Sequence, residues 1–149
     1  RPPAKIMEGS VVARSLISNG CIIIRAHVEH SVLSPGVIVH EGAVVRDSII
    51  MTDSEIGPGA VVDRCIIDKH VRIGAGSRVG CGDDMTPNWL EPTRLNSGIT
   101  IVGRNAIVPA GVTIGRNVLI GTDVTEADFT STVIPSGETV NPMVAVLWS

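Results

Sequence analysis

The sequence repeats itself at a period of about 17 residues between Ile22 and Val79. Similar residues recur at this period in four columns: Ile22, Val39, Ile56 and Ile73; Ala26, Ala43, Ala60 and Ser77; Val28, Val45, Val62 and Val79; and Ser31, Ser48 and Cys65. A fixed period of this kind indicates units that stack on one another and share one continuous core.

Each repeating unit has a shorter inner period of about six. Ile22, Val28 and Ser34 are six apart, and Val39 follows five positions later. After position 98 the sixfold period is regular, at Val102, Val108, Ile114 and Ile120. We interpret one unit as a coil with three short sides, in which the aliphatic first place and the small fifth place of each hexad point inward.

The fourth place of each hexad is suited to a corner. It is occupied by Gly42, Gly59, Gly76, Asn105, Gly111, Asn117 and Asp123. Gly, Asn and Asp are the residues that best tolerate positive φ. The sequence therefore predicts an all-β, triangular parallel solenoid of roughly seven coils with one inserted loop, about 30 Å long at about 4.8 Å per coil.

The pattern divides a single domain into five segments. They are an extended opening segment (1–9), coils (10–79), an inserted loop (80–98), coils (99–137) and a C-terminal tail (138–149). Pro2 and Pro3 favour an opening segment without strands. Because the chain lacks an initiator Met, we expect it to be part of a longer protein.

Composition restricts the partners and the compartment. Hydrophobic residues make up 44% of the chain but aromatic residues only 2%, as a narrow interior without room for rings would require. The net charge of −3 gives no reason to expect nucleic acid or a membrane surface as a partner. Three cysteines without metal spacing fit a reducing cytoplasm, and Cys65 is expected to be a small buried residue.

Two apolar features outside the repeat each allow two interpretations. Trp89 in the inserted loop is either an anchor at an interface or a side chain folded back onto the outer face of the prism. The tail Met143–Trp148 either covers the last coil, whose backbone edge would otherwise be unpaired, or contacts another subunit.

No catalytic or metal constellation is recognisable. His30 shares a column with Asp47 and Arg64 and should face water. The four histidines do not repeat a common zinc-ligand spacing, and the glycines are corner residues rather than a phosphate-binding loop. We expect no catalytic centre, no metal and no cofactor in this chain, although a single His could serve as the general base of an acyltransferase.

One corner concentrates positive charge. Lys69, His70 and Arg72 lie within four positions, and Lys69 is one of only two lysines in the chain. The cluster is either a solvated corner or an anion site, with Lys as a point charge for phosphate and Arg as a fork.

Several motifs in order resemble glucose-1-phosphate adenylyltransferases (ADP-glucose pyrophosphorylases). They are Pro2-Pro3-Ala4-Lys5, Glu41 to Ser48, Ile66-Ile67-Asp68-Lys69, Ser97-Gly98-Ile99 and Val108 to Gly111, and the resemblance covers about residues 2–121. It implies a left-handed parallel β-helix, the hexapeptide-repeat solenoid, that follows an N-terminal catalytic domain.

The resemblance also implies a function for the longer protein. The family makes ADP-glucose and pyrophosphate from ATP and glucose 1-phosphate with Mg²⁺, for glycogen or starch synthesis, as a tetramer controlled by phosphorylated metabolites. The nucleotide loop and the metal carboxylates belong to the catalytic domain. We therefore expect this chain to be the regulatory and oligomerisation domain, inactive alone. The alternative is a hexapeptide acyltransferase or the β-helix of another sugar-nucleotide transferase.

The resemblance assigns effector binding to Lys5 and Lys69, and we add Arg72 because it is close to Lys69. If Lys5 and Lys69 contact one ligand, the opening segment must run along the side of the prism rather than cap its end.

Overall fold

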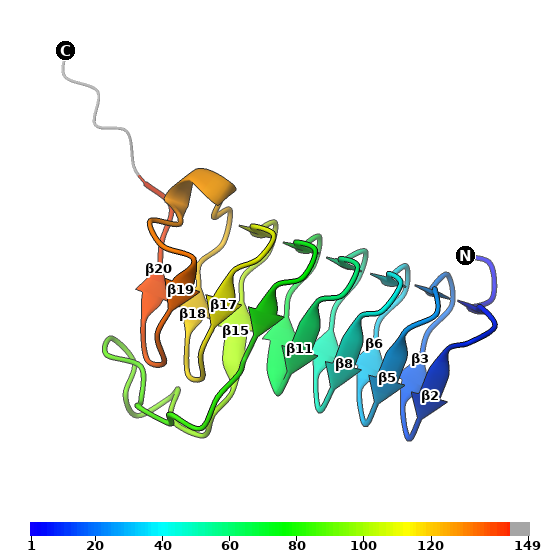
Figure 1. Cartoon of the computed structure of the whole chain (residues 1–149), viewed down its shortest axis with the longest axis horizontal. Helices are drawn as coiled ribbons and strands as arrows, with labels where there is room; N and C mark the ends of the chain where they lie inside the picture. The colour runs from blue at the N-terminus through cyan, green and yellow to red at the C-terminus, as the bar shows by residue number, and fades with distance from the viewer. Residues whose placement is uncertain (144–149) are drawn as a thin grey trace, which may run out of the picture.

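The computed structural model describes residues 1–143, which form a three-sided parallel β-solenoid (Figure 1). The first sheet (sheet A) contains β1 (Lys5–Ile6), β4 (Ile22–Ile23), β7 (Ile38–Val39), β10 (Glu55–Ile56), β13 (Arg72–Ile73) and β16 (Ile107–Val108). The second (sheet B) contains β2 (Val11–Ala13), β5 (His27–Glu29), β8 (Val44–Arg46), β11 (Val61–Asp63), β14 (Arg78–Val79), β17 (Thr113–Ile114) and β19 (Val133–Ile134). The third (sheet C) contains β3 (Leu16–Ile17), β6 (Val32–Leu33), β9 (Ile49–Ile50), β12 (Cys65–Ile67), β15 (Thr100–Val102), β18 (Leu119–Ile120) and β20 (Thr139–Val140).

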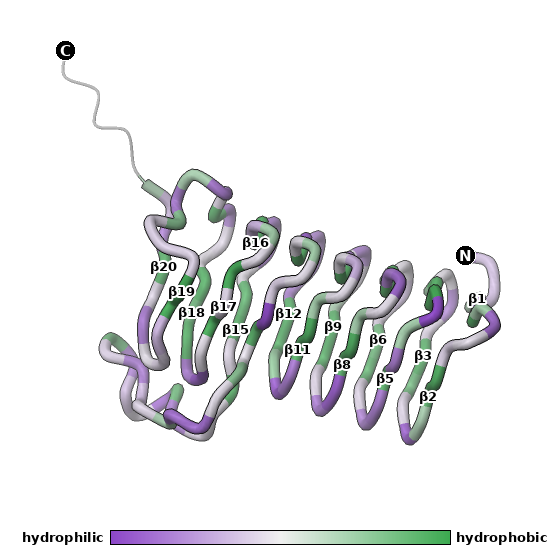
Figure 2. The backbone as a smooth tube through the Cα atoms, in the orientation of Figure 1, coloured by the Kyte–Doolittle hydropathy of each residue, from purple (hydrophilic) through white to green (hydrophobic). Residues whose placement is uncertain are grey.

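Sheets B and C each contain seven strands, which confirms the expected all-β solenoid of roughly seven coils in the left-handed β-helix class. The chain visits sheets A, B and C in turn, so every strand pairs in parallel with strands one coil away. Each side of a coil turns one small and one aliphatic side chain inward, as Ala43 and Val45 do on the side that contains β8. Hydrophobic residues lie on the strands and hydrophilic ones gather at the corners (Figure 2).

The core is a stack of aliphatic side chains. In sheet A, Val39, Ile56, Ile73 and Val108 lie in register one above another and are almost completely buried. The small residues Ala43 and Ala60 are buried as expected. A prism this narrow is filled by Val, Ile, Leu and Ala, which explains the low aromatic content.

The inward register assigned from the sequence is wrong in one coil. Ile23 rather than Ile22 pairs with Val39, and Leu33 rather than Ser34 is fully buried. The pairing of Ile23 with Val39 makes this coil one residue shorter than the next, in which Val39 pairs with Ile56. Because alternate residues of a strand face opposite sides, a shift of one residue exchanges the buried and the exposed position.

All seven corner positions expected to have positive φ have it, at values between 57° and 75°. In the earlier coils, the corner between sheets B and C has other residues in the same left-handed region, at Arg14, His30, Asp47 and Arg64. Because this region favours Gly, Asn and Asp, the Arg and His residues do not reveal the corner in the sequence.

A ladder of hydroxyl groups supports the corner between sheets B and C. The backbone N–H of Ser31 donates to Ser15 Oγ, that of Ser48 to Ser31 Oγ, and that of Cys65 to Ser48 Oγ, at 3.0–3.1 Å. Each serine hydroxyl in turn donates to the carbonyl oxygen two residues earlier. Cys65 ends the ladder, and its 2% exposure confirms that it is a small buried residue.

The opening segment is not free of strands, contrary to expectation, because Lys5–Ile6 forms β1 and pairs with β4.

At the other end of the prism, a short 3-10 helix, η1 (Glu126–Asp128), lies between β18 and β19, where a strand of sheet A would otherwise follow. Most of the apolar tail that we considered as a cover or a contact, residues 144–149, lies outside the described residues. Among residues 1–143 no helix has the length and apolar character needed to cross a membrane.

The inward and outward positions predict different costs of truncation. Ile56→Ala should destabilise the fold by about 2–5 kcal/mol, because it leaves a cavity in a side-chain stack that is fully buried. Ile49→Ala, one strand earlier and 42% exposed, is the matched control and should cost less than half as much. Chemical denaturation of both variants measures the difference, and equal losses would show that the described register is wrong.

Candidate functional site

The three residues proposed from the sequence are exposed but not close together. Lys5 lies on β1, Lys69 lies at the corner before β13, and Arg72 lies on β13. Four strand steps separate β1 from β13 in sheet A. At about 4.8 Å per step, Lys5 lies about 19 Å from the other two residues along the prism.

Arg72 is not a free cation. It directly opposes Glu55 in the neighbouring strand, and the two side chains form an ion pair. A cross-strand pair of opposite charge is a common stabilising feature of sheets. Part of the positive charge that the sequence assigns to this corner is therefore already neutralised, and Lys69 is the more available group.

The structure adds Arg1 to the same corner. Its guanidinium donates two hydrogen bonds to the carboxylate of Asp53, at 2.6 and 3.0 Å. Asp53 lies one coil from His70, whose backbone N–H donates to Thr52 O. Arg1 thus lies at the corner between sheets C and A beside Gly20, and its side chain, rather than Lys5, extends along this corner towards Lys69.

Gly36 makes room for this ion pair. Its φ is +78°, and a Cβ atom there would meet Arg1 Nη1 at 1.9 Å and Asp53 Oδ1 at 2.0 Å. The hydrogen bonds from Arg1 lower the pKa of the Asp53 carboxyl below its ordinary value. No sequence pattern could have indicated this contact, because the two residues are 52 positions apart.

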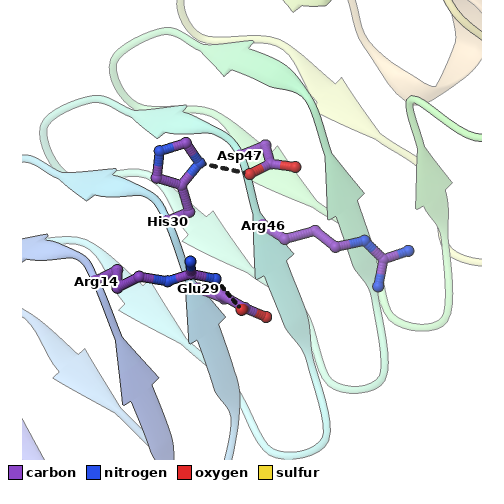
Figure 3. Close-up of a pocket in the computed structure, with 5 residues that line it drawn as sticks. All are labelled: Arg14, Glu29, His30, Arg46 and Asp47. Carbon is purple, nitrogen blue, oxygen red and sulfur yellow. Dashed lines mark hydrogen bonds and ion pairs between the residues drawn. The ribbon is translucent and has the colours of Figure 1, made fainter.

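A recess of about 240 Å³ lies at the opposite corner, between sheets B and C (Figure 3). Arg14 pairs with Glu29 at 2.7 Å, and His30 Nδ1 lies 2.7 Å from Asp47 Oδ1. His30 faces water beside Asp47, as expected. Arg46 points away from these two pairs (Figure 3) and lies 3.5 Å from Asp63.

The basic and acidic side chains of this recess are paired with one another. Arg14 and then His27 lower the pKa of the Glu29 carboxyl by hydrogen bonding. Each basic side chain that lines the recess (Arg14, His30 and Arg46) contacts an acidic residue on the neighbouring coil, and among the described residues no serine, threonine or cysteine lines the recess as a nucleophile. Burial raises the pKa of the Cys65 thiol far above its ordinary value, which makes this cysteine unreactive.

The inserted loop is fastened by two fully buried asparagines. Asn88 donates from Nδ2 to Asn117 O, Glu138 O and Thr139 Oγ1, at 3.0–3.2 Å. Asn117 accepts the backbone N–H of Gly98 at 2.7 Å and donates to the carbonyl oxygens of residues 85 and 86. The loop is therefore held against the last coils by several buried polar contacts.

The loop presents large apolar side chains to solvent. Trp89 is 71% exposed and Leu90 is 68% exposed. The interpretation in which Trp89 folds back onto the prism is therefore wrong, while its role as an interface anchor stays a prediction. Among residues 1–143, no three His, Cys, Asp or Glu side chains group closely enough to hold a metal ion.

Comparison with known proteins identifies related sequences. A family model described as "GlmU-like, C-terminal hexapeptide" matches residues 2–102. A glucose-1-phosphate adenylyltransferase of Thermomicrobium roseum is 72% identical over all of this chain and 35% of that protein. One from Acetivibrio thermocellus is 44% identical over 94% of this chain and 32% of that protein.

The chain spans about a third of the length of these relatives and matches their C-terminal part. Among solved structures, the acetyltransferase domain of PglB from Neisseria gonorrhoeae FA1090 is 27% identical. The match covers 95% of this chain and 58% of that one, with a TM-score of 0.41. A likeness at that TM-score carries no argument about function.

The contact between Arg1 and Asp53 predicts a pH dependence. Because the pKa of Asp53 is lowered in the folded protein, the ion pair contributes fully above the unfolded value near 3.8 and is lost as the pH falls through the lower folded value. Arg1→Gln should return the pKa of Asp53 towards its ordinary value, as measured by NMR titration of the carboxyl carbon.

The matched control for this titration is Asp84, whose pKa is lowered by hydrogen bonds from Thr86 alone. It should titrate identically in wild type and Arg1→Gln. An Asp53 midpoint that does not move in the variant would show that Arg1 is not its partner in solution.

Proposed function

Since this chain belongs to the GlmU-like C-terminal hexapeptide family and corresponds to the C-terminal part of glucose-1-phosphate adenylyltransferases, we propose that it is the regulatory and oligomerisation domain of such an enzyme. The observation that carries this proposal is the alignment of the whole chain with the last third of its relatives. The longer enzyme would make ADP-glucose and pyrophosphate from ATP and glucose 1-phosphate.

The chemistry would belong to the segment that precedes this chain. The Mg²⁺ that the activity implies finds no fitting donor cluster among residues 1–143. The described ion pairs and buried thiols also leave no aligned base and nucleophile. In this proposal the β-helix contributes assembly and control, in a tetramer and in the cytoplasm, where three free cysteines would stay reduced.

We also propose that Lys69 binds a phosphorylated effector. Lys69 is exposed at the corner between sheets C and A, and the guanidinium of Arg1, which is paired with Asp53, lies within one coil of it. The preceding domain would therefore start at the corner that also carries Lys69, close to Gly20, and could extend along this corner to complete the site. Arg72 would act mainly by holding Glu55 away from the ligand, because these two residues are paired.

Lys5 could contribute to an effector site together with a Lys69 residue only if the two belong to different subunits of an oligomer. A small effector cannot span the distance of about 19 Å from Lys69 within one chain, which is four strand steps. If both lysines contact effectors, Lys5 would contribute to a site on a neighbouring subunit of the proposed oligomer.

The first prediction concerns catalysis. Residues 1–149 alone, incubated with ATP, Mg²⁺ and glucose 1-phosphate, should release no pyrophosphate above a blank without protein. The full-length enzyme is the positive control. Turnover by the isolated chain that survives repurification would contradict the assignment of the chemistry to the preceding segment.

The second prediction concerns regulation. In the full-length enzyme, Lys69→Ala should raise the half-activating concentration of a phosphorylated effector about tenfold, because one charged contact is worth about 1.5 kcal/mol or more. The measurement is an activation curve at fixed salt, with sugar bisphosphates and phosphorylated acids as probes. Arg78→Ala is the matched control, since Arg78 is an exposed cation on sheet B. An unchanged curve for Lys69→Ala would return Lys69 to the role of a solvated corner residue.

A further inference from the structure

The ion pair between Arg1 and Asp53 does not follow from the repeat. Three other exposed arginines bond to a carboxylate of the neighbouring coil, 15 to 17 positions away: Arg14 to Glu29, Arg25 to Glu41 and Arg72 to Glu55. Arg1 and Asp53 are 52 positions apart, and Gly36 lies beside both of them on the corner between sheets C and A. The register of the strands therefore does not impose this contact, and it needs another explanation.

The Arg1 side chain lies across two glycines. Gly20 and Gly36 both have positive φ, and a Cβ atom at Gly20 would meet the Cβ and Cδ atoms of Arg1 at 3.4 and 3.2 Å. The side chain thus packs against bare backbone at these two positions and remains 42% exposed. Among residues 1–143 it hydrogen-bonds only to Asp53.

Arg116 shows how an arginine is held when its role is structural. Its side chain is 14% exposed, and it donates both to Gly82 O and to the carboxylate of Asp63. Two different groups and the surrounding protein therefore fix its position. Arg1 has one partner and an open flank, so its guanidinium can change partner without disturbing the core.

The corner that carries Lys69 has no excess of positive charge. Its basic residues are Arg1, Lys69 and Arg72, and its acidic residues are Asp53, Glu55 and Asp68. Further along the corner, Arg104 and Asp123 add one charge of each sign. With His70 neutral, an anion would therefore be attracted only where one of the basic groups is released from its carboxylate.

Asp53 is the acidic residue best placed to release its partner. Glu55 faces Arg72 because the two are paired in register, and Asp68 Oδ1 accepts the backbone N–H of Lys69 at 2.7 Å. Both of these contacts are built into the local fold. The contact of Asp53 with Arg1 is not, because it depends on a side chain that crosses two glycines.

Asp53 is also close to the group that an effector would approach. It lies one coil from His70, which lowers the pKa of the Asp53 carboxyl in addition to the larger effect of Arg1. At about 4.8 Å per coil, a phosphate group bound by Lys69 would lie near the guanidinium of Arg1. A guanidinium binds phosphate and carboxylate through the same pair of parallel hydrogen bonds. The two anions would therefore compete for one group.

We propose that Asp53 competes with the phosphorylated effector for the guanidinium of Arg1. Without effector, Arg1 is bound to Asp53, as in the described structure. When the effector binds at Lys69, the guanidinium moves from the carboxylate to a phosphate group. Asp53 thereby sets the effector concentration that activation requires. This proposal rests on the proposed function, because it takes the corner at Lys69 as the effector site.

Activation curves of the full-length enzyme test the proposal, with a sugar bisphosphate as the probe and at fixed salt. Asp53→Asn removes the charge but suits the backbone, since Asn tolerates the φ of +59° at this position. It should lower the half-activating concentration about twofold to fivefold, the range that corresponds to an exposed ion pair. Arg1→Gln should raise this concentration at least about twofold.

The matched control is Glu41→Gln. It also removes one negative charge and releases one exposed arginine, Arg25, but at the corner between sheets A and B. Its activation curve should be that of the wild type. Thermal denaturation of every variant checks folding, and Asp53→Gly, which tolerates the same φ, is the second variant if Asp53→Asn folds poorly.

The double variant separates competition from simple repulsion. In the Arg1→Gln background, Asp53→Asn should lose most of its effect, because no guanidinium remains to be released. An equal fall of the half-activating concentration in both backgrounds would show that Asp53 only repels the effector, and would overturn the proposal.

The outcomes for Lys69→Ala and Asp53→Asn distinguish this proposal from the proposed function. A weakened response of Lys69→Ala with an unchanged Asp53→Asn curve would overturn the competition alone. Stronger activation of Asp53→Asn with an unchanged Lys69→Ala curve would support the competition at Arg1 and count against effector binding by Lys69. Unchanged curves for both variants would overturn both proposals.

Discussion

Hydrogen bonding of each coil to the next is the constraint on which the rest of the structure depends. A strand of two or three residues cannot persist alone, and here every interior strand pairs on both edges, as β10 does with β7 and β13. Stability is therefore a sum over neighbouring coils. Pairing in register also forces inward residues into stacks, so that Ile56 can only lie between Val39 and Ile73. Coils that differ in length by one residue coexist because the difference is absorbed at corners.

The repeat predicted the fold well because residues of the same kind recur at each inward position and at each corner, at fixed intervals along the chain. It failed where the interval changed. The run from Cys21 to Ile24 is apolar at every position, so either set of alternate residues could face inward. The 17-residue spacing of the later coils, extended back from Val39, predicted that Ile22 faces inward. The structure instead buries Cys21 and Ile23, which the shorter coil requires. Only the pairing with the next coil could decide between the two.

The candidate site was less predictable because it depends on contacts between distant residues. The corner at Lys69 could be located from the period, and counting coils already separates it from Lys5. The ion pair of Arg1 with Asp53 could not be found, since neither residue lies in a motif and Gly36 contributes only by lacking a side chain. The same holds for the inserted loop, whose position is set by the buried amides of Asn88 and Asn117.

The outer faces of a solenoid can each serve a different role, because the inward side chains alone are sufficient to form the core. Sheet B and its corner carry paired charges such as Arg14 with Glu29, which are compatible with solvent. Sheet C instead exposes aliphatic side chains, among them Leu16, Val32 and Ile49. The corner between sheets C and A holds both the Arg1 contact and the exposed Lys69. Under the proposed function, an effector at Lys69 would therefore bind at the same corner as Arg1, the residue that the preceding domain joins. A coupling free energy between two sites requires a shared element of this kind, and the corner that holds both Lys69 and Arg1 would supply one between the effector and the preceding domain.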